Sequence, residues 1–118
     1  MILVDTSVWI EHLRGTLPEL SQCLEQGTIA IHPWVIGELA CGNLQNRQLV
    51  LDLLKALPPV AIATDHEILL MIESRQLMGR GIGYIDAHLI TSALLSQAIL
   101  WTRDRRLAAV AGELHLSY

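Results

Sequence analysis

The stretch Met1-Ile2-Leu3-Val4-Asp5-Thr6-Ser7-Val8-Trp9-Ile10 decides the fold of this chain. Its apolar start predicts a short buried strand, and Asp5 stands where that strand gives way to polar residues. Asp5-Thr6-Ser7 is also an ordinary helix N-cap sequence, which gives Asp5 a purely structural interpretation. A functional interpretation places Asp5 at the carboxyl end of a parallel strand, where open α/β sheets bind ligands.

Apolar runs without polar alternation predict further strands of the kind that helices cover on both faces. Helical stretches separate these runs, which indicates an α/β chain with right-handed crossovers onto a parallel sheet. The pattern predicts a three-layer sandwich with a central, mostly parallel five-stranded sheet flanked by helices. The predicted strands are Ile2–Val4, Thr28–Ile31, Val60–Ala63, Ile99–Thr102 and Leu114–Leu116.

Several residues mark where the helices begin and end. Thr16-Leu17-Pro18-Glu19 and Thr64-Asp65-His66-Glu67 both have the capping-box pattern. Gly27 suits the position after a helix end, and Pro33 suits the first turn of the next helix. The other predicted helices include Arg47–Leu57, Asp65–Leu77 and Tyr84–Gln97.

Three further acids join Asp5 in this topology. Asp104 follows the predicted strand Ile99–Thr102, and Glu38 lies early in the helix after the second strand. Asp86 opens the helix Tyr84–Gln97, which ends next to the start of a strand and therefore begins at the carboxyl edge of the sheet. We expect all four carboxylates to meet at that edge, with the helix N-terminus favouring the charge of Asp86.

Composition limits the class of protein. A chain of 118 residues is predicted to form one domain, residues 1–118, and its 52% hydrophobic content leaves room for apolar partner surfaces. No apolar run approaches the length of a membrane span, and no basic leader precedes the first strand. Cys23 and Cys41 match no metal spacing and are expected to be reduced thiols in a cytoplasmic protein.

The net charge of −4 does not exclude a nucleic-acid partner. Setting the four site acids aside leaves equal numbers of acidic and basic residues, and bound cations would reverse the local sign. Arg103, Arg105 and Arg106 are either a solvated first helical turn or contacts to RNA phosphates.

An all-carboxylate site suits Mg²⁺ or Mn²⁺ better than Zn²⁺. Such a site supports in-line displacement at phosphorus by an activated water. The five histidines show no ligand spacing. Trp101 is expected in the core, whereas Trp9 and Trp34 belong either to the core or to a partner groove.

Together these motifs resemble a PIN-domain ribonuclease, and in particular the VapC-type toxins of bacterial toxin–antitoxin pairs. The resemblance rests on residues 1–10, on Glu38 within Val35–Leu39, on Asp86–Ile90 and on Thr102–Leu107. It implies that Asp5, Glu38, Asp86 and Asp104 are catalytic and that Asp5, Asp86 and Asp104 hold Mg²⁺ or Mn²⁺. It further implies supporting roles for Ser7 and Thr102.

The resemblance also implies an RNA substrate, a cognate antitoxin protein that covers the acidic site, and a homodimer. Two alternatives remain open on the residues alone. A non-cutting RNA- or protein-binding module would use the same acids without cleavage. An aspartate-nucleophile phosphatase would need a second acid two residues after Asp5, where this chain has Ser7.

Overall fold

The computed structural model describes residues 1–118 as three strands and seven helices. The strands are β1 (Ile2–Val4), β2 (Ile29–Ala30) and β3 (Ile99–Trp101). The helices are α1 (Thr6–Gly15), α2 (Pro18–Glu25), α3 (Pro33–Ala40), α4 (Arg47–Lys55), α5 (Asp65–Ser74), α6 (Tyr84–Leu95) and α7 (Arg105–Glu113). None of these helices combines the length and the apolar character needed to cross a membrane.

The sheet is parallel and has the strand order β2-β1-β3, so the first strand of the chain lies at its centre. Ile2 pairs with Ile29 on one side and with Ile99 on the other. Leu3 and Val4 have no exposed surface, as expected for a central strand covered on both faces. This register brings the ends of β1 and β3 to the same edge of the sheet, because Val4 pairs with Trp101.

The prediction of five strands is wrong, since Val60–Ala63 and Leu114–Leu116 form no strands. Each neighbouring segment makes one isolated parallel bridge, Pro59 with Ile31 and Ser117 with Leu100. The Val60 N–H donates to the Ile31 carbonyl, and the ladder stops there because α3 begins at Pro33, which has no N–H to donate. Residues 114–115 instead complete the last turn of α7, where the Leu114 N–H donates to Val110.

The helix boundaries follow most of the predicted signals. The Thr64 capping box is present, Gly27 has a φ of 70° after α2, and Pro33 opens α3. The predicted capping box at Thr16 is wrong, because Thr16 ends α1 and Leu17 occupies the N-cap of α2 without a side-chain bond. His12 of α1 accepts the Leu17 N–H through Nδ1 at 3.0 Å instead.

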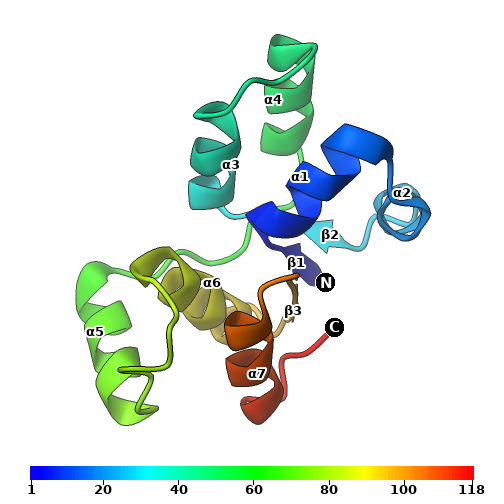
Figure 1. The fold of residues 1–118 in the computed structure, drawn as a ribbon. Coiled ribbons are helices and arrows are strands. Elements are labelled where there is room, and N and C mark those ends of the chain that lie inside the picture. Colours follow the sequence, from blue (N-terminus) through cyan, green and yellow to red (C-terminus); the bar gives the residue numbers. More distant parts are fainter.

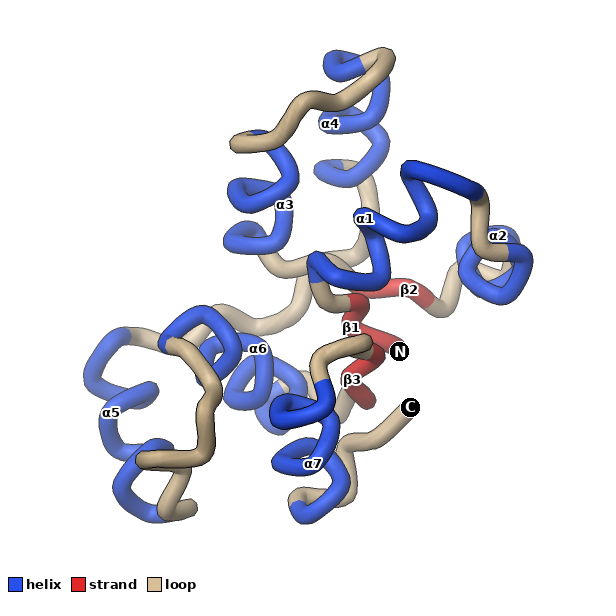
Figure 2. The backbone as a smooth tube through the Cα atoms, in the orientation of Figure 1, coloured by secondary structure: helices blue, strands red, loops and turns tan.

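The helices form two groups around the small sheet, and the molecule measures 41 × 24 × 23 Å. Figure 1 shows α1, α3 and α4 toward one end and α5, α6 and α7 toward the other. In Figure 2 the three red strands lie between these groups. Helix α1 packs on α3, and both α6 and α7 pack on β3. The acid-bearing ends of α1, α6 and α7 therefore belong to elements that meet at the sheet.

Candidate functional site

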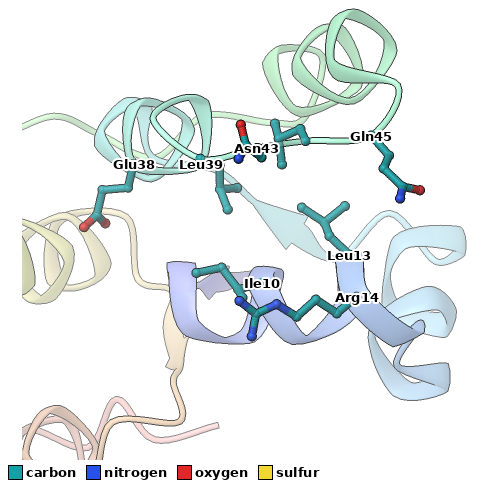
Figure 3. Close-up of a pocket in the computed structure, with 9 residues that line it drawn as sticks. Ile10, Leu13, Arg14, Glu38, Leu39, Asn43 and Gln45 are labelled. Carbon is teal, nitrogen blue, oxygen red and sulfur yellow. The ribbon is translucent and has the colours of Figure 1, made fainter.

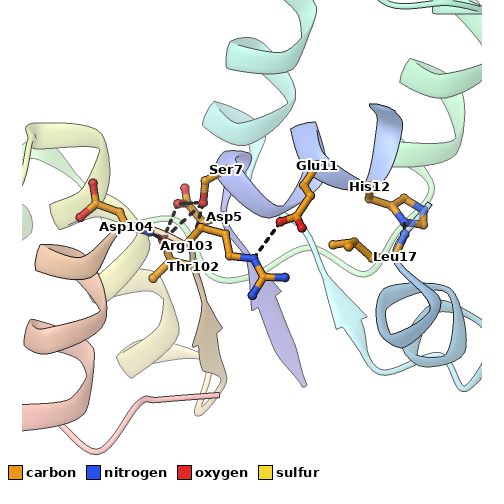
Figure 4. A network of polar contacts seen from close by, with 8 residues as sticks. All are labelled: Asp5, Ser7, Glu11, His12, Leu17, Thr102, Arg103 and Asp104. Carbon is orange, nitrogen blue, oxygen red and sulfur yellow. Dashed lines mark hydrogen bonds and ion pairs between the residues drawn. The ribbon is translucent and has the colours of Figure 1, made fainter. Parts of the chain in front are cut away.

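Asp5 lies between β1 and α1 and is 7% exposed. Its Oδ1 accepts the Thr6 N–H at 2.8 Å, so Asp5 is the N-cap of α1. Its Oδ2 accepts the hydroxyls of Ser7 at 2.8 Å and of Thr102 at 2.7 Å (Figure 4). The structural interpretation of Asp5 therefore holds, and the same bonds fix the orientation of a buried carboxylate that no cationic side chain neutralises.

Asp104 is the N-cap of α7, and Oδ1 accepts the N–H groups of Arg106 and Leu107 at 2.9 Å each. The Asp104 N–H itself donates to Thr102 Oγ1 at 3.0 Å. Thr102 therefore joins Asp5 and Asp104 in one network at the end of β3, visible in Figure 4. Ser7 extends this network, because its Oγ accepts the Arg103 N–H at 3.1 Å.

Glu38 reaches the same region from α3, where its Oε1 accepts the Thr6 hydroxyl at 2.7 Å. This bond ties the third helix to the start of α1. Glu38 and Asp104 are both exposed, so they carry no burial penalty, in contrast to Asp5. Thr6 was not among the sequence-predicted site residues, although its position directly after Asp5 in an N-cap motif is the signal that places it there.

Asp86 is half-buried in the first turn of α6, and its Oδ2 accepts the Gly83 N–H at 3.0 Å. Burial raises the pKa of Asp86 above its ordinary value, and the negative charges of Asp5, Asp104 and Glu38 raise the pKa further. The Gly83 bond opposes part of this shift. The structure thus brings the four acids within electrostatic range of one another, from four different elements.

The donor set fits a hard divalent cation, although no three His, Cys, Asp or Glu side chains stand close enough to hold an ion by themselves. Mg²⁺ usually keeps several waters and takes only one or two protein carboxylates, so a close cage of three is not required. Glu38, Asp86 and Asp104 each use one oxygen in the bonds described above and retain a second. These free carboxylate oxygens are of the kind that a partly hydrated Mg²⁺ or Mn²⁺ ion prefers.

The three arginines have different surroundings. Arg103 Nε donates to Glu11 Oε2 at 2.8 Å, which draws this side chain toward α1 (Figure 4). The Arg106 side chain lies against Gly81, where a Cβ atom would come within 2.5 Å of its Cδ. Gly81 has a φ of 77°, a backbone conformation that favours glycine, whereas the flexible Arg106 side chain could move away from an added Cβ atom. Arg105 is exposed at the start of α7.

An open groove of about 430 Å³ adjoins Glu38. Helix α1 contributes Ile10, Leu13 and Arg14, helix α3 contributes Glu38 and Leu39, and residues 42–45 close the far side (Figure 3). Ile10 and Leu13 are each 39% exposed. The groove therefore offers apolar contacts beside one of the acids.

The three tryptophans fall into two groups, core residues and a surface residue. Trp9 and Trp101 are 3% and 5% exposed and belong to the core, whereas Trp34 is 38% exposed at the surface of α3. Cys23 and Cys41 are both free.

Comparisons with known proteins agree with this architecture. The family model described as PIN domain matches residues 2–113. Ribonuclease VapC32 of two Mycobacterium tuberculosis strains is 49% identical over 114 residues, which cover 96% of this chain and 92% of the relative. The crystal structure of PAE2754 from Pyrobaculum aerophilum matches with a TM-score of 0.62 and 20% identity, over 92% of this chain and 78% of that one, and supports the fold alone. This chain belongs to the PIN-domain family.

Proposed function

We propose that this protein is a metal-dependent endoribonuclease and the toxin of a toxin–antitoxin pair. The observation that carries the proposal is the meeting of Asp5, Glu38, Asp86 and Asp104 at one edge of the sheet, with Asp86 under the combined repulsion of the other three. Its similarity to proteins named ribonuclease VapC32 over nearly its whole length supports the same reaction class.

Each acid has a role that follows from its surroundings. Asp5 is buried and held by two hydroxyls and a backbone N–H, which makes it the most rigid candidate metal ligand. Asp86 and Asp104 would complete the ligand set, and Glu38 would orient the attacking water. Bound Mg²⁺ or Mn²⁺ would supply a water of lowered pKa and stabilise the charge that develops at phosphorus.

Ser7 and Thr102 act as positioning residues for Asp5. Both hydroxyls donate to the same carboxylate oxygen, and Thr102 also accepts the Asp104 N–H. Of the three arginines, Arg105 is the best candidate for a phosphate contact. Arg103 is paired with Glu11, and Arg106 packs on the loop before α6. Contacts of this kind would position the RNA backbone without reading its sequence.

Metal removal tests the proposed reaction directly. Purified protein incubated with total RNA is expected to cut it in Mg²⁺ or Mn²⁺, to stop in EDTA and to resume when the cation is restored. Without the cation, nothing lowers the pKa of the attacking water or offsets the negative charge at phosphorus. Gel electrophoresis of the RNA measures the outcome. Cleavage that continues undiminished in EDTA would refute the metal-dependent mechanism, and absence of cleavage with every divalent cation would favour a non-cutting RNA- or protein-binding module.

The phosphatase alternative is tested by the same preparation. Position 7 is a serine that donates to Asp5, so the second acid that such an enzyme needs is absent. Detection of a phosphate group covalently bound to Asp5 would support the phosphatase alternative.

The groove beside Glu38 is our proposed antitoxin site. A segment with apolar side chains over Ile10 and Leu13 and a basic group toward Glu38 would match both the apolar wall of the groove and the acid beside it. Such a segment would occlude the edge at which RNA must bind.

Replacing Leu13 by glutamate should separate cleavage from inhibition. The Leu13 side chain lies on the wall of the groove and is not one of the four acids, so RNA cleavage should persist. Inhibition by the co-expressed adjacent small protein should weaken at least about tenfold. A charge placed at an apolar contact costs about 1.4 kcal/mol or more, which corresponds to that factor. Inhibition titrations of Leu13→Glu and of Leu49→Glu, the same change at a more exposed leucine on α4, give the comparison. Equal inhibition of both variants and the wild type would show that the antitoxin binds outside this groove.

We further infer a homodimer. Ile62, Leu69 and Leu95, from the segment before α5 and from α5 and α6, are 59%, 57% and 50% exposed, which leaves apolar surface outside the groove. Light scattering of the purified protein at micromolar concentration should give twice the chain mass of 13.1 kDa. A monomer mass at that concentration would contradict this inference.

A further inference from the structure

The contact between α3 and α6 carries two exposed aromatic rings beside the acids. Trp34 lies in the first turn of α3, and Tyr84 is the first residue of α6. Their ring centroids are 6.2 Å apart, with ring planes at 65°. The side chains are 38% and 41% exposed, so the pair presents ring surface to solvent.

Contacts with His88 and Asp65 hold the two rings of this pair in place. The His88 ring, 2% exposed, stacks against Trp34 at a centroid distance of 4.4 Å and meets Tyr84 edge-on at 4.8 Å. The Tyr84 hydroxyl donates to Asp65 Oδ1 at 2.7 Å. Because both rings are already held in place, their side chains lose little additional entropy when a flat ligand stacks on one ring and meets the other at its edge.

The rings and two of the acids come from the same helices. Glu38 follows Trp34 by one helical turn, about 6 Å along the axis of α3 and on the same face. Asp86 follows Tyr84 by two residues at the start of α6. Trp34 and Glu38 therefore share one face of α3, whereas Tyr84 and Asp86 lie in the same first turn of α6 but point to different sides. The Trp34 ring is thus one helical turn from an acid of the site.

We propose that Trp34, with Tyr84 inclined edge-on beside it, forms a stacking platform for an unpaired nucleobase of the RNA substrate. Stacking of bases on aromatic side chains is the common means by which proteins hold single-stranded RNA, and it needs no particular base. A base in a duplex is already stacked on its neighbours, so the platform selects single-stranded or looped RNA. The proposal deepens the proposed function, because it rests on RNA as the substrate of the acid site.

Tryptophan fluorescence offers a test that does not depend on cleavage. Trp9 and Trp101 are buried, so Trp34 is the tryptophan that a ligand in solution can reach. In EDTA at low ionic strength, an RNA octamer without self-complementarity should quench the fluorescence saturably. An abasic octamer with the same backbone, and the blunt-ended duplex of the same sequence, should leave it nearly unchanged.

Variants assign the effect to the two rings. The affinity for the end-labelled octamer, measured by fluorescence anisotropy, should fall about tenfold in Trp34→Ala and in Tyr84→Leu. Tyr84→Phe keeps the ring and should bind within about twofold of the wild type, as should the matched control Leu49→Ala, whose side chain is 60% exposed on α4. In Mn²⁺ the ring-deleted variants should raise KM for the octamer more than they lower kcat. Thermal melting identifies any variant that fails to fold, and Trp34→Leu, which fills more of the space but has no ring, then replaces Trp34→Ala.

The possible outcomes distinguish a failure of the proposed stacking platform from a failure of the proposed nuclease activity. Equal quenching by the abasic octamer, or unchanged affinity in both ring-deleted variants, overturns the platform, even when cleavage proceeds normally. Base-dependent quenching without cleavage in any divalent cation supports the platform and refutes the proposed reaction. Protection of Trp34 by the partner protein, with no quenching by RNA, assigns the rings to protein recognition and also overturns the proposal.

Discussion

Replacing Asp5 by asparagine lowers the rate of RNA cleavage by more than about 100-fold, because even residues that only support a metal ligand typically contribute 10- to 100-fold. Asparagine has the size of aspartate and retains a carbonyl oxygen for the Thr6 N–H. The hydroxyls of Ser7 and Thr102 can rotate to accept from the new amide instead of donating to it. The fold should therefore survive while the buried negative charge is lost.

Asp52→Asn is the matched control, because it makes the same chemical change at an exposed position of α4. Its kcat/KM should equal that of the wild type within about twofold, as is usual for surface substitutions. Circular dichroism melting of both variants excludes unfolding as the cause of any loss. Full activity of a folded Asp5→Asn protein would remove Asp5 from the metal site.

Asp86→Asn should abolish most of the activity and yet stabilise the metal-free protein. Burial, and then the charges of Asp5, Asp104 and Glu38, raise the pKa of Asp86, so the ionised carboxylate is disfavoured in the folded state. The amide keeps an acceptor for the Gly83 N–H and carries no charge. In EDTA at neutral pH the variant should melt above the wild type. In millimolar Mn²⁺ the wild type should gain more, because a cation that binds only the folded state stabilises it by mass action.

The pH dependence of that difference follows from the direction of the shift. A carboxyl whose pKa is raised in the folded state binds its proton more tightly there, so its favourable contribution is complete below its unfolded pKa and is lost as pH rises through the folded value. The melting advantage of Asp86→Asn in EDTA should therefore vanish in the acid range below the ordinary aspartate pKa and be complete at neutral pH. Equal melting of both proteins at neutral pH would mean that Asp86 is not under the repulsion of the other acids.

The pH test compares the melting temperatures of Asp86→Asn and the wild type, because His32 makes the stability of both proteins change with pH in the opposite direction. Burial, followed by repulsion from His88, lowers the pKa of His32 to about 4. His32 also caps α3 by accepting the Trp34 N–H through Nδ1 at 3.0 Å. Folding therefore requires its neutral form, and stability falls as pH drops from the ordinary histidine range toward 4. Both proteins share this loss, so it cancels in their comparison.

The sequence predicted the fold class because its strongest signals are local. The run Ile2–Val4 is apolar without alternation, and the structure places it as the central strand, with Leu3 and Val4 fully buried. The Thr64 capping box and Pro33 at a helix start were likewise readable, since a cap depends on residues within one turn. The roles of the four acids as catalytic and metal-binding residues stay a prediction that the experiments above test.

The errors came from segments where a second element decides the structure. Val60–Ala63 has the composition of a strand, but the chain after its partner Ile31 enters α3 at Pro33, which restricts the pairing to one bridge. Thr16 has the spacing of an N-cap, yet the close succession of α1 and α2 uses it to end the first helix. Local propensity is a weak prior where another element competes for the same residues.

By itself the sequence determined an α/β chain with acids after its strands Ile2–Val4 and Ile99–Thr102, and a family resemblance that the comparisons confirm. Only the tertiary structure decided what those acids touch. The Thr6 hydroxyl holds Glu38, Thr102 links Asp5 to Asp104, and Trp34 stacks on His88. Most of these partners lie more than thirty residues apart in the chain. Local patterns encode caps and periodicity, whereas contacts between distant residues arise from the packing of whole helices on the sheet, which no short stretch of sequence specifies.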